Sequence, residues 1–200
     1  MLFIPIPPLF HSAYSGAAFE FCIDCESPLA PSGIVYSVQK FVVANETVFE
    51  LAICNQCRTA LYLQFSEESR AAIQGYIDQH SRPQPLVIVL PHDTEANAET
   101  QQVDVESLDS LQACVLCQTH KSQLHRYAMV GLFIGDELMV MNRNESHIPI
   151  PCLICDRCNR GMEKLLSKAT RDEWNRFIED HFSGPPGIEL DPTHELPLLV

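Results

Sequence analysis

Cysteine is the residue whose number and spacing point most directly to chemistry in this chain of 200 residues. Eight of its nine cysteines form four pairs with the spacing Cys-x-x-Cys, and two such pairs can complete a tetrahedral site of four thiolates for a metal ion. The alternative is four redox or disulfide pairs, which are typical of exported proteins. We favour metal binding because the pairing is even and because Met1–Phe10, with three prolines and no Lys or Arg, is a poor signal peptide.

An internal repeat indicates which pairs belong together. Ile53–Cys57 aligns with Ile154–Cys158 at an offset of 101 residues, and this offset continues without a gap to His80 and His181. The two earlier pairs align at an offset of 92, so the second copy is nine residues longer between its pairs. A duplicated unit should carry its own complete site, which disfavours a cross-braced pairing of the first pair with the third. The predicted ligands are Cys22, Cys25, Cys54 and Cys57 in site 1, and Cys114, Cys117, Cys155 and Cys158 in site 2.

Sulfur-only tetrahedral sites favour zinc, with iron as the main competitor. The spacing of Cys152, Cys155 and Cys158 is similar to the start of a bacterial ferredoxin run, but Met162 occupies the fourth position and supplies no thiolate. Neither predicted site has an obvious open position or a substitute ligand, as expected of structural sites. We therefore predict two Zn²⁺ ions per chain, with iron less favoured.

The residues around the pairs indicate the elements that must position the sulfurs. Runs rich in β-branched and aromatic residues predict a hairpin in each copy, with turns at Ala44–Glu46 and Gly135–Asp136. Apolar residues at helical spacing predict a helix after each second pair, and Thr170–Glu173 has the form of a capping box. The predicted strands are 34–43, 47–53, 126–134 and 137–141, and the predicted helices are 66–80 and 170–182.

The order of elements in each copy resembles the treble-clef class of zinc modules, over residues 22–80 and 114–182. The resemblance implies that Cys54/Cys57 and Cys155/Cys158 lie on the first turn of a helix. Zinc-ribbon and rubredoxin-like turns usually have Gly directly after the second Cys, and this chain has no Gly at any of these positions. The choice between a zinc ribbon and a treble clef therefore stays open. The residues at those positions here are Glu26, Arg58, Gln118 and Asn159.

The predicted fold class is α+β, with two duplicated zinc modules packed as a pseudo-twofold pair. A hydrophobic content of 46% is sufficient for a buried core. The predicted segments are an apolar N-terminal extension at 1–18, zinc module 1 at 19–82, a strand plus acidic linker at 83–112, zinc module 2 at 113–183 and a C-terminal tail at 184–200.

The net charge of −13 disfavours nucleic acid as a partner of the whole chain. Within the second module, however, five basic residues recur at helical spacing. If one helix spans them, they form a basic stripe, which is either a phosphate contact or a solvated face paired with acidic neighbours. We favour the solvated face. The five residues are Arg157, Arg160, Lys164, Lys168 and Arg171.

Three further residues have both a functional and a structural interpretation. Cys152 aligns with Leu51 and is either a reactive thiol or a small buried residue of a strand, and we favour the buried residue. His80 and His181 occupy equivalent helix ends, where an imidazole stabilises the helix dipole or packs on the other module.

No catalytic constellation stands out, so we predict that the chain is not an enzyme. No apolar run approaches the roughly 18 residues that span a bilayer, so we expect no membrane partner and a cytoplasmic location. The leading hypothesis is a non-catalytic zinc-binding adaptor or regulator that contacts other proteins. The alternatives are a nucleic-acid-associated zinc protein that uses the basic stripe, and a thiol redox switch that uses Cys152 and labile zinc.

Overall fold

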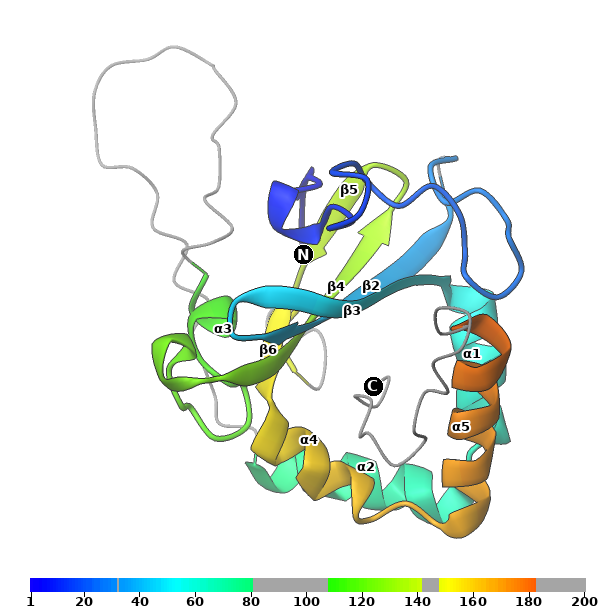
Figure 1. Ribbon diagram of the computed structural model, residues 1–200, viewed down its shortest axis with the longest axis vertical. Helices are drawn as coiled ribbons and strands as arrows, with labels where there is room; N and C mark the ends of the chain where they lie inside the picture. The colour runs from blue at the N-terminus through cyan, green and yellow to red at the C-terminus, as the bar shows by residue number, and fades with distance from the viewer. Residues whose placement is uncertain (32, 81–107, 142–147, 183–200) are drawn as a thin grey trace, which may run out of the picture.

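The computed structural model describes residues 1–31, 33–80, 108–141 and 148–182. These residues form a mixed α/β fold around one antiparallel sheet of six strands, in the order β1-β5-β4-β2-β3, with β6 paired to β4 (Figure 1). The strand predicted between residues 83 and 112 falls on Leu86–Leu90, which lies outside the described residues, as does the predicted tail at 184–200. The short helix α3 (Asp109–Gln112) precedes the second copy.

The first copy is a hairpin that runs directly into two helices. Ala44 and Asn45 connect its strands with φ angles of 51° and 67°, the left-handed pair that matches the twist of a tight hairpin. The predicted hairpin is confirmed to within about one residue at each end. Its elements are β2 (Val35–Val43), β3 (Glu46–Cys54), α1 (Asn55–Gln64) and α2 (Glu67–His80).

The second copy repeats this order, but its second strand is interrupted. Strands β5 and β6 pair with different parts of the same edge of β4, β5 with Leu132–Ile134 and β6 with Tyr127–Val130. In the first copy, β3 alone pairs along the whole of β2. The nine extra residues of the second copy therefore lie between β5 and β6. The elements are β4 (Arg126–Ile134), β5 (Glu137–Val140), β6 (Cys152–Cys155), α4 (Asp156–Glu163) and α5 (Lys168–His181), with a short 3-10 turn, η3 (Lys121–Gln123), ahead of β4.

Strand β2 joins the two copies, because its second edge pairs with β4. The ladder runs from Val35 opposite Ile134 to Val43 opposite Arg126, so it uses the full length of both strands. The hairpins of both copies thus belong to one sheet and contribute to one apolar core.

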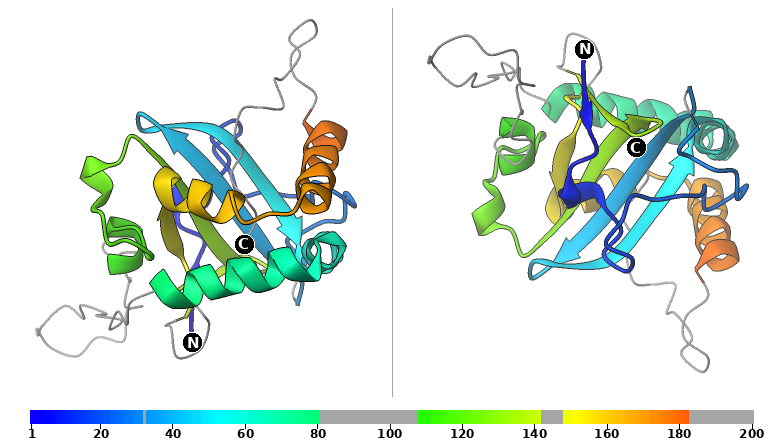
Figure 2. Two further views of the ribbon diagram at one scale, coloured as in Figure 1. Left: turned by 90° about the horizontal axis from the view of Figure 1, so that it is seen from below. Right: turned by 90° about the horizontal axis from the view of Figure 1, so that it is seen from above.

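The N-terminal segment covers one face of this sheet, and the helices lie on the other (Figure 2). Strand β1 (Leu2–Pro5) pairs with β5, and the 3-10 turn η1 (Pro8–Phe10) follows it. The ring of Phe10 packs edge-on against Phe133 at 5.4 Å, and Phe133 stacks on Tyr36 at 5.2 Å. Gly131 makes room for these rings, since a Cβ there would lie 2.7 Å from Phe133.

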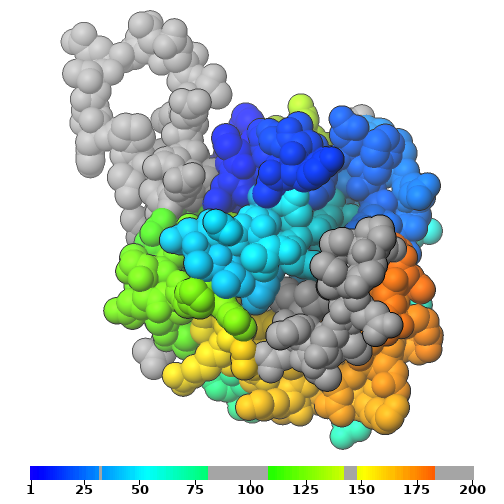
Figure 3. Space-filling model, viewed as in Figure 1, coloured from blue at the N-terminus to red at the C-terminus, as the bar shows by residue number. Residues whose placement is uncertain are grey.

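A largely buried ion pair fastens the N-terminal segment to the hairpin of the first copy, on which it sits in the space-filling view (Figure 3). Lys40 and Glu50 are cross-strand neighbours with Nζ and Oε2 3.3 Å apart. Glu50 accepts hydrogen bonds from the Ser12 hydroxyl at 2.7 Å and from the Ala13 N–H at 2.9 Å, and Lys40 donates to the His11 carbonyl. Burial pushes the pKa of Glu50 upward, but these hydrogen bonds and the Lys40 charge outweigh it and hold that pKa below its usual value.

A second connection between the copies is an exchange of hydrogen bonds at the helix starts. The N–H of Ser66, before α2, donates to the Thr170 hydroxyl at 3.0 Å, and the N–H of Ser167, before α5, donates to the Ser69 hydroxyl at 2.8 Å. Ser66 and Ser167 also share a hydrogen bond between their hydroxyls at 2.9 Å. Ser69 and Thr170 are fully buried, so these hydroxyls take the place of water.

This exchange corrects the predicted start of α5. The N-cap is Ser167, whose hydroxyl accepts a hydrogen bond from the N–H of Thr170, and the helix begins at Lys168. The predicted N-cap, Thr170, instead lies inside the first turn. Its hydroxyl is directed to the other copy, where it accepts from the N–H of Ser66.

Replacement of Thr170 by Val should destabilise the fold, because it removes the acceptor of the part-buried Ser66 N–H while leaving the side-chain volume almost unchanged. An unpaired buried donor costs about 1–3 kcal/mol, and we expect a loss of this size in denaturant unfolding. Thr170→Ser, which keeps the hydroxyl, is the matched control and should lose less. Equal losses in the two variants would show that the hydroxyl contributes nothing.

Candidate metal centres

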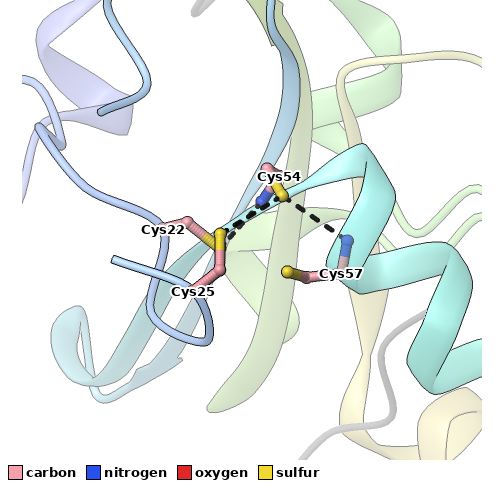
Figure 4. Close-up of side chains that lie close together, drawn as sticks. All are labelled: Cys22, Cys25, Cys54 and Cys57. Carbon is pink, nitrogen blue, oxygen red and sulfur yellow. Dashed lines mark hydrogen bonds between the residues drawn. The ribbon is translucent and has the colours of Figure 1, made fainter. Parts of the chain in front are cut away.

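The first group of cysteines is assembled from a turn and from the junction of a strand with a helix. Cys22 and Cys25 lie in a turn before β2, Cys54 and Cys57 lie where β3 passes into α1, and their side chains converge (Figure 4). The N–H of Cys54 donates to the sulfur of Cys22 at 3.3 Å. Cys54 is the N-cap of α1, and its sulfur accepts from the N–H of Cys57 at 3.5 Å. These N–H groups favour negative charge on the sulfurs.

The second group repeats this construction. Cys155 is the N-cap of α4, and its N–H donates to the sulfur of Cys114 at 3.3 Å. The turn is attached to the neighbouring strand by a bond from the Val115 N–H to the Leu153 carbonyl at 2.9 Å. The counterpart in the first copy, from Ile23 to Ala52, has the same length. These two contacts recur in both copies, whereas the sulfur of Cys155 accepts no capping hydrogen bond of the kind that Cys54 accepts.

The residue after the first pair takes a left-handed conformation in each copy. Glu26 and Gln118 have φ angles of 57° and 63°, and their N–H groups bind the carbonyls of Cys22 and Cys114. Glycine adopts this conformation most readily, which explains its frequency in such turns. The two other positions noted in the sequence, Arg58 and Asn159, lie inside α1 and α4. The first pair of each copy is therefore a turn, and the second pair opens a helix.

Within each group, the sulfur positions suit a tetrahedral metal site. All four sulfurs of a group lie within 4.8 Å of one another, and the groups consist of the eight residues that the repeat predicted, paired first with second and third with fourth. The sulfurs of Cys25 and Cys54 are 3.9 Å apart, and those of Cys117 and Cys155 are 3.6 Å apart. A Zn–S bond of about 2.3 Å gives a tetrahedral edge of about 3.8 Å, whereas a disulfide needs about 2.05 Å. None of the nine cysteines forms a disulfide, and both groups could hold a metal ion.

One sulfur in each group is predisposed to be a thiolate. Hydrogen bonds from the thiols of Cys155 and Cys158 lower the pKa of Cys114 to about 2, and the same contact with Cys114 raises the pKa of Cys155 to about 12. In the first group, hydrogen bonds from the hydroxyl and the N–H of Ser27 lower the pKa of Cys25 to about 6. A divalent ion would displace the protons of the other thiols.

Cys152 belongs to neither group. It lies on β6 opposite Val130, with no exposed surface, and its counterpart Leu51 is buried in the same way. Burial, followed by the charge of Cys114, raises the pKa of Cys152 to about 12. The residue therefore occupies a packing position in the core, as the alignment with Leu51 predicted.

Each of the two equivalent histidines contacts the last turn of its own helix. Nδ1 of His80 lies 2.8 Å from the Tyr76 carbonyl, and Nδ1 of His181 lies 2.8 Å from the Phe177 carbonyl. Nε2 of His181 also lies 3.2 Å from a carboxylate oxygen of Asp24, in the turn of the first site. The contact of His181 with the other copy was one of the two predicted roles.

The predicted basic stripe does not lie on one helix, because α4 ends at Glu163 and α5 begins only at Lys168. The chain turns between them, where Ser167 caps α5. Arg157 and Arg160 lie on α4, Lys168 and Arg171 lie on α5, and Lys164 lies between the two helices. Three of the five have partners within their module: Arg160 pairs with Asp156 at 3.0 Å, Lys168 pairs with Asp172 at 2.6 Å, and Arg171 donates to the Leu166 carbonyl at 3.0 Å.

Comparisons with protein families, with curated proteins and with solved structures gave no match. Among the described residues, no helix has both the length and the apolar character needed to cross a membrane. The two cysteine groups are therefore the features of the chain that bear most directly on function.

Replacement of Cys117 by Ala should reduce the metal content by one ion per chain, because it removes a sulfur from the second group only. Replacement of Cys152 by Ala should leave the metal content unchanged, because this sulfur belongs to neither group. Elemental analysis of the purified variants measures both effects. Retention of both ions in Cys117→Ala, or loss of one in Cys152→Ala, would contradict the assignment of ligands.

Proposed function

We propose that the chain is a zinc protein in which two four-cysteine sites stabilise the fold, and that it acts as a non-catalytic adaptor or regulator through contacts with other proteins. The observation that carries the proposal is the convergence of eight cysteine sulfurs into two equivalent groups at helix starts. Zinc, when bound, would supply a closed tetrahedral centre without redox chemistry. Such a site offers no open position to a substrate, which supports a role other than catalysis.

We further propose that each copy is a treble-clef-type module and that a pseudo-twofold axis relates the copies. The left-handed turn, the hairpin and the helix that opens at the second pair support the first point. The register of β2 with β4 supports the second, because Val38 pairs with Gly131 and Gln39 pairs with Val130. At the offset of 92, Val130 is the counterpart of Val38 and Gly131 that of Gln39, so the ladder interchanges equivalent residues.

The charge balance favours a protein partner over a nucleic acid. The chain has a net charge of −13, and four thiolates around one divalent ion add two negative charges at each site. This field opposes the approach of phosphates. The ion pairs of Arg160 and Lys168 with neighbouring acidic residues further reduce the positive charge that a phosphate would meet.

Metal analysis of the purified chain should find two zinc ions, and a strong chelator should cause loss of tertiary structure. A structural zinc site contributes about 10–16 kcal/mol of apparent binding free energy, more than the stability of most small domains. Acid should release the zinc as well, because protonated thiols do not bind it. The measurements are elemental analysis and near-ultraviolet circular dichroism, and a chain with bound iron or with no metal would contradict the proposal.

The adaptor role predicts a protein partner that depends on the folded, metal-loaded state. Affinity capture from the source cells should recover a specific protein with the wild-type chain, and much less of it with Cys117→Ala. Purified partner and chain should then form a complex at physiological ionic strength. Capture of nucleic acid, with affinity that falls steeply as salt rises, would instead favour the nucleic-acid alternative.

A further inference from the structure

The two metal sites have different neighbours, and part of each neighbourhood comes from the other copy. Helix α2 of the first copy contacts α4, which opens at the second site (Figure 1). Helix α5 of the second copy reaches the first site through the contact of His181 with Asp24 at 3.2 Å. Each long helix therefore touches the metal site of the opposite copy.

At the second site, α2 presents a hydroxyl group to a ligand sulfur. Tyr76 lies so close to α4 that a Cβ on Gly161 would be 2.9 Å from its Cζ atom. The Tyr76 hydroxyl forms a hydrogen bond with the sulfur of Cys158 across the contact between α2 and α4. This O–H group can donate to a ligand sulfur, and such donors hold ligands in place and spread their charge.

At the first site, the corresponding position offers no donor. The counterpart of Tyr76 is Phe177, which has no hydroxyl. The turn of this site instead contains Asp24, which directly precedes the ligand Cys25 and lies 3.2 Å from Nε2 of His181. The counterpart of Asp24 in the second turn is Leu116, which is buried. The first turn therefore has a carboxyl group beside its ligands where the second turn has an apolar side chain.

The sites also differ in their exposure to solvent. In the first group, Cys25 is exposed and Cys57 is half-buried. In the second group, Cys114, Cys155 and Cys158 are buried and Cys117 is half-buried. Ligand exchange at a closed site needs access of a competitor to a metal–sulfur bond, and among the eight predicted ligands Cys25 is the one exposed residue.

We propose that the two sites are functionally unequal: the first site exchanges its metal with the surrounding solution, whereas the second site retains its metal, held by the Tyr76 hydroxyl of the opposite copy. The inference rests on the proposed zinc-binding function and assigns regulation by metal exchange to the site of Cys22, Cys25, Cys54 and Cys57. Competing ligands of the thiol or chelator class would act there. The second site keeps the fold intact while the first exchanges.

Zinc release from the metal-loaded full chain to a coloured chelator in excess tests this inequality. We expect two phases of one zinc each, with rates that differ at least tenfold. Alkylation with iodoacetamide during the first phase, followed by peptide mass spectrometry, should label Cys25 and Cys57 before Cys155 and Cys158. A single rate for both ions, or earlier labelling of the second group, would overturn the inference. A chain without zinc would instead contradict the proposed function.

Two substitutions test whether Tyr76 and Asp24 cause the difference in release rate between the two sites. Tyr76→Phe removes only the hydroxyl and should accelerate the slow phase about tenfold, the lower end of the usual effect of such neighbours on metal affinity. Asp24→Asn removes the carboxylate charge and should slow the fast phase. Tyr62→Phe, on the exposed surface of α1, is the matched control and should alter neither phase. An unchanged slow phase in Tyr76→Phe would show that the hydroxyl does not hold the second site.

Discussion

The pairing of β2 with β4 is the interaction on which the rest of the structure depends. A single copy, with one hairpin and two helices, is small and buries a limited apolar surface by itself. The nine-residue ladder joins both hairpins in one sheet, and the core beneath it draws on both copies. Because the paired strands are counterparts in the repeat, their antiparallel pairing brings the helix starts of the two copies together. The exchange of hydrogen bonds among Ser66, Ser69, Ser167 and Thr170 completes the connection between the copies.

The parts of the fold that were predictable from the sequence are those that neighbouring residues determine. The hairpin turns follow from Ala44–Glu46 and Gly135–Asp136, and the repeat identifies which cysteines converge. The start of α5 was wrongly predicted because Ser167 and Thr170 both satisfy the local rule for an N-cap. Only the Ser66 N–H in the other copy decides between them. Ser-x-x-Ser at 66–69 recurs as Ser-x-x-Thr at 167–170, and this recurrence was the sequence signal for the true N-cap. It can be interpreted only once the starts of α2 and α5 are known to lie together.

The pairing of β2 with β4 could not be predicted either, because an apolar strand does not specify its neighbour. The prediction of a basic stripe on one helix was wrong because sequence spacing does not reveal where a helix ends. The five basic residues keep spacings of three and four residues across the break between α4 and α5. The nine extra residues of the second copy were visible as a length difference. Their place between β5 and β6 depends on the register of both strands along β4.

The proposed pair of metal sites would resolve a conflict that a single four-thiolate site faces. A site that contributes most of the stability of a small domain cannot release its metal without unfolding that domain. Here, the hairpin of the first copy is also held by the ladder with β4 and by the Lys40–Glu50 ion pair, neither of which depends on the first site. In the proposed exchange, these contacts would hold the sheet while the first turn releases its ion. Both groups are attached to the sheet in the same way, Cys54 through β3, which pairs with β2, and Cys155 through β6, which pairs with β4. The proposed inequality of the two sites therefore lies in their neighbours and in the exposure of Cys25, and not in how they are attached to the sheet.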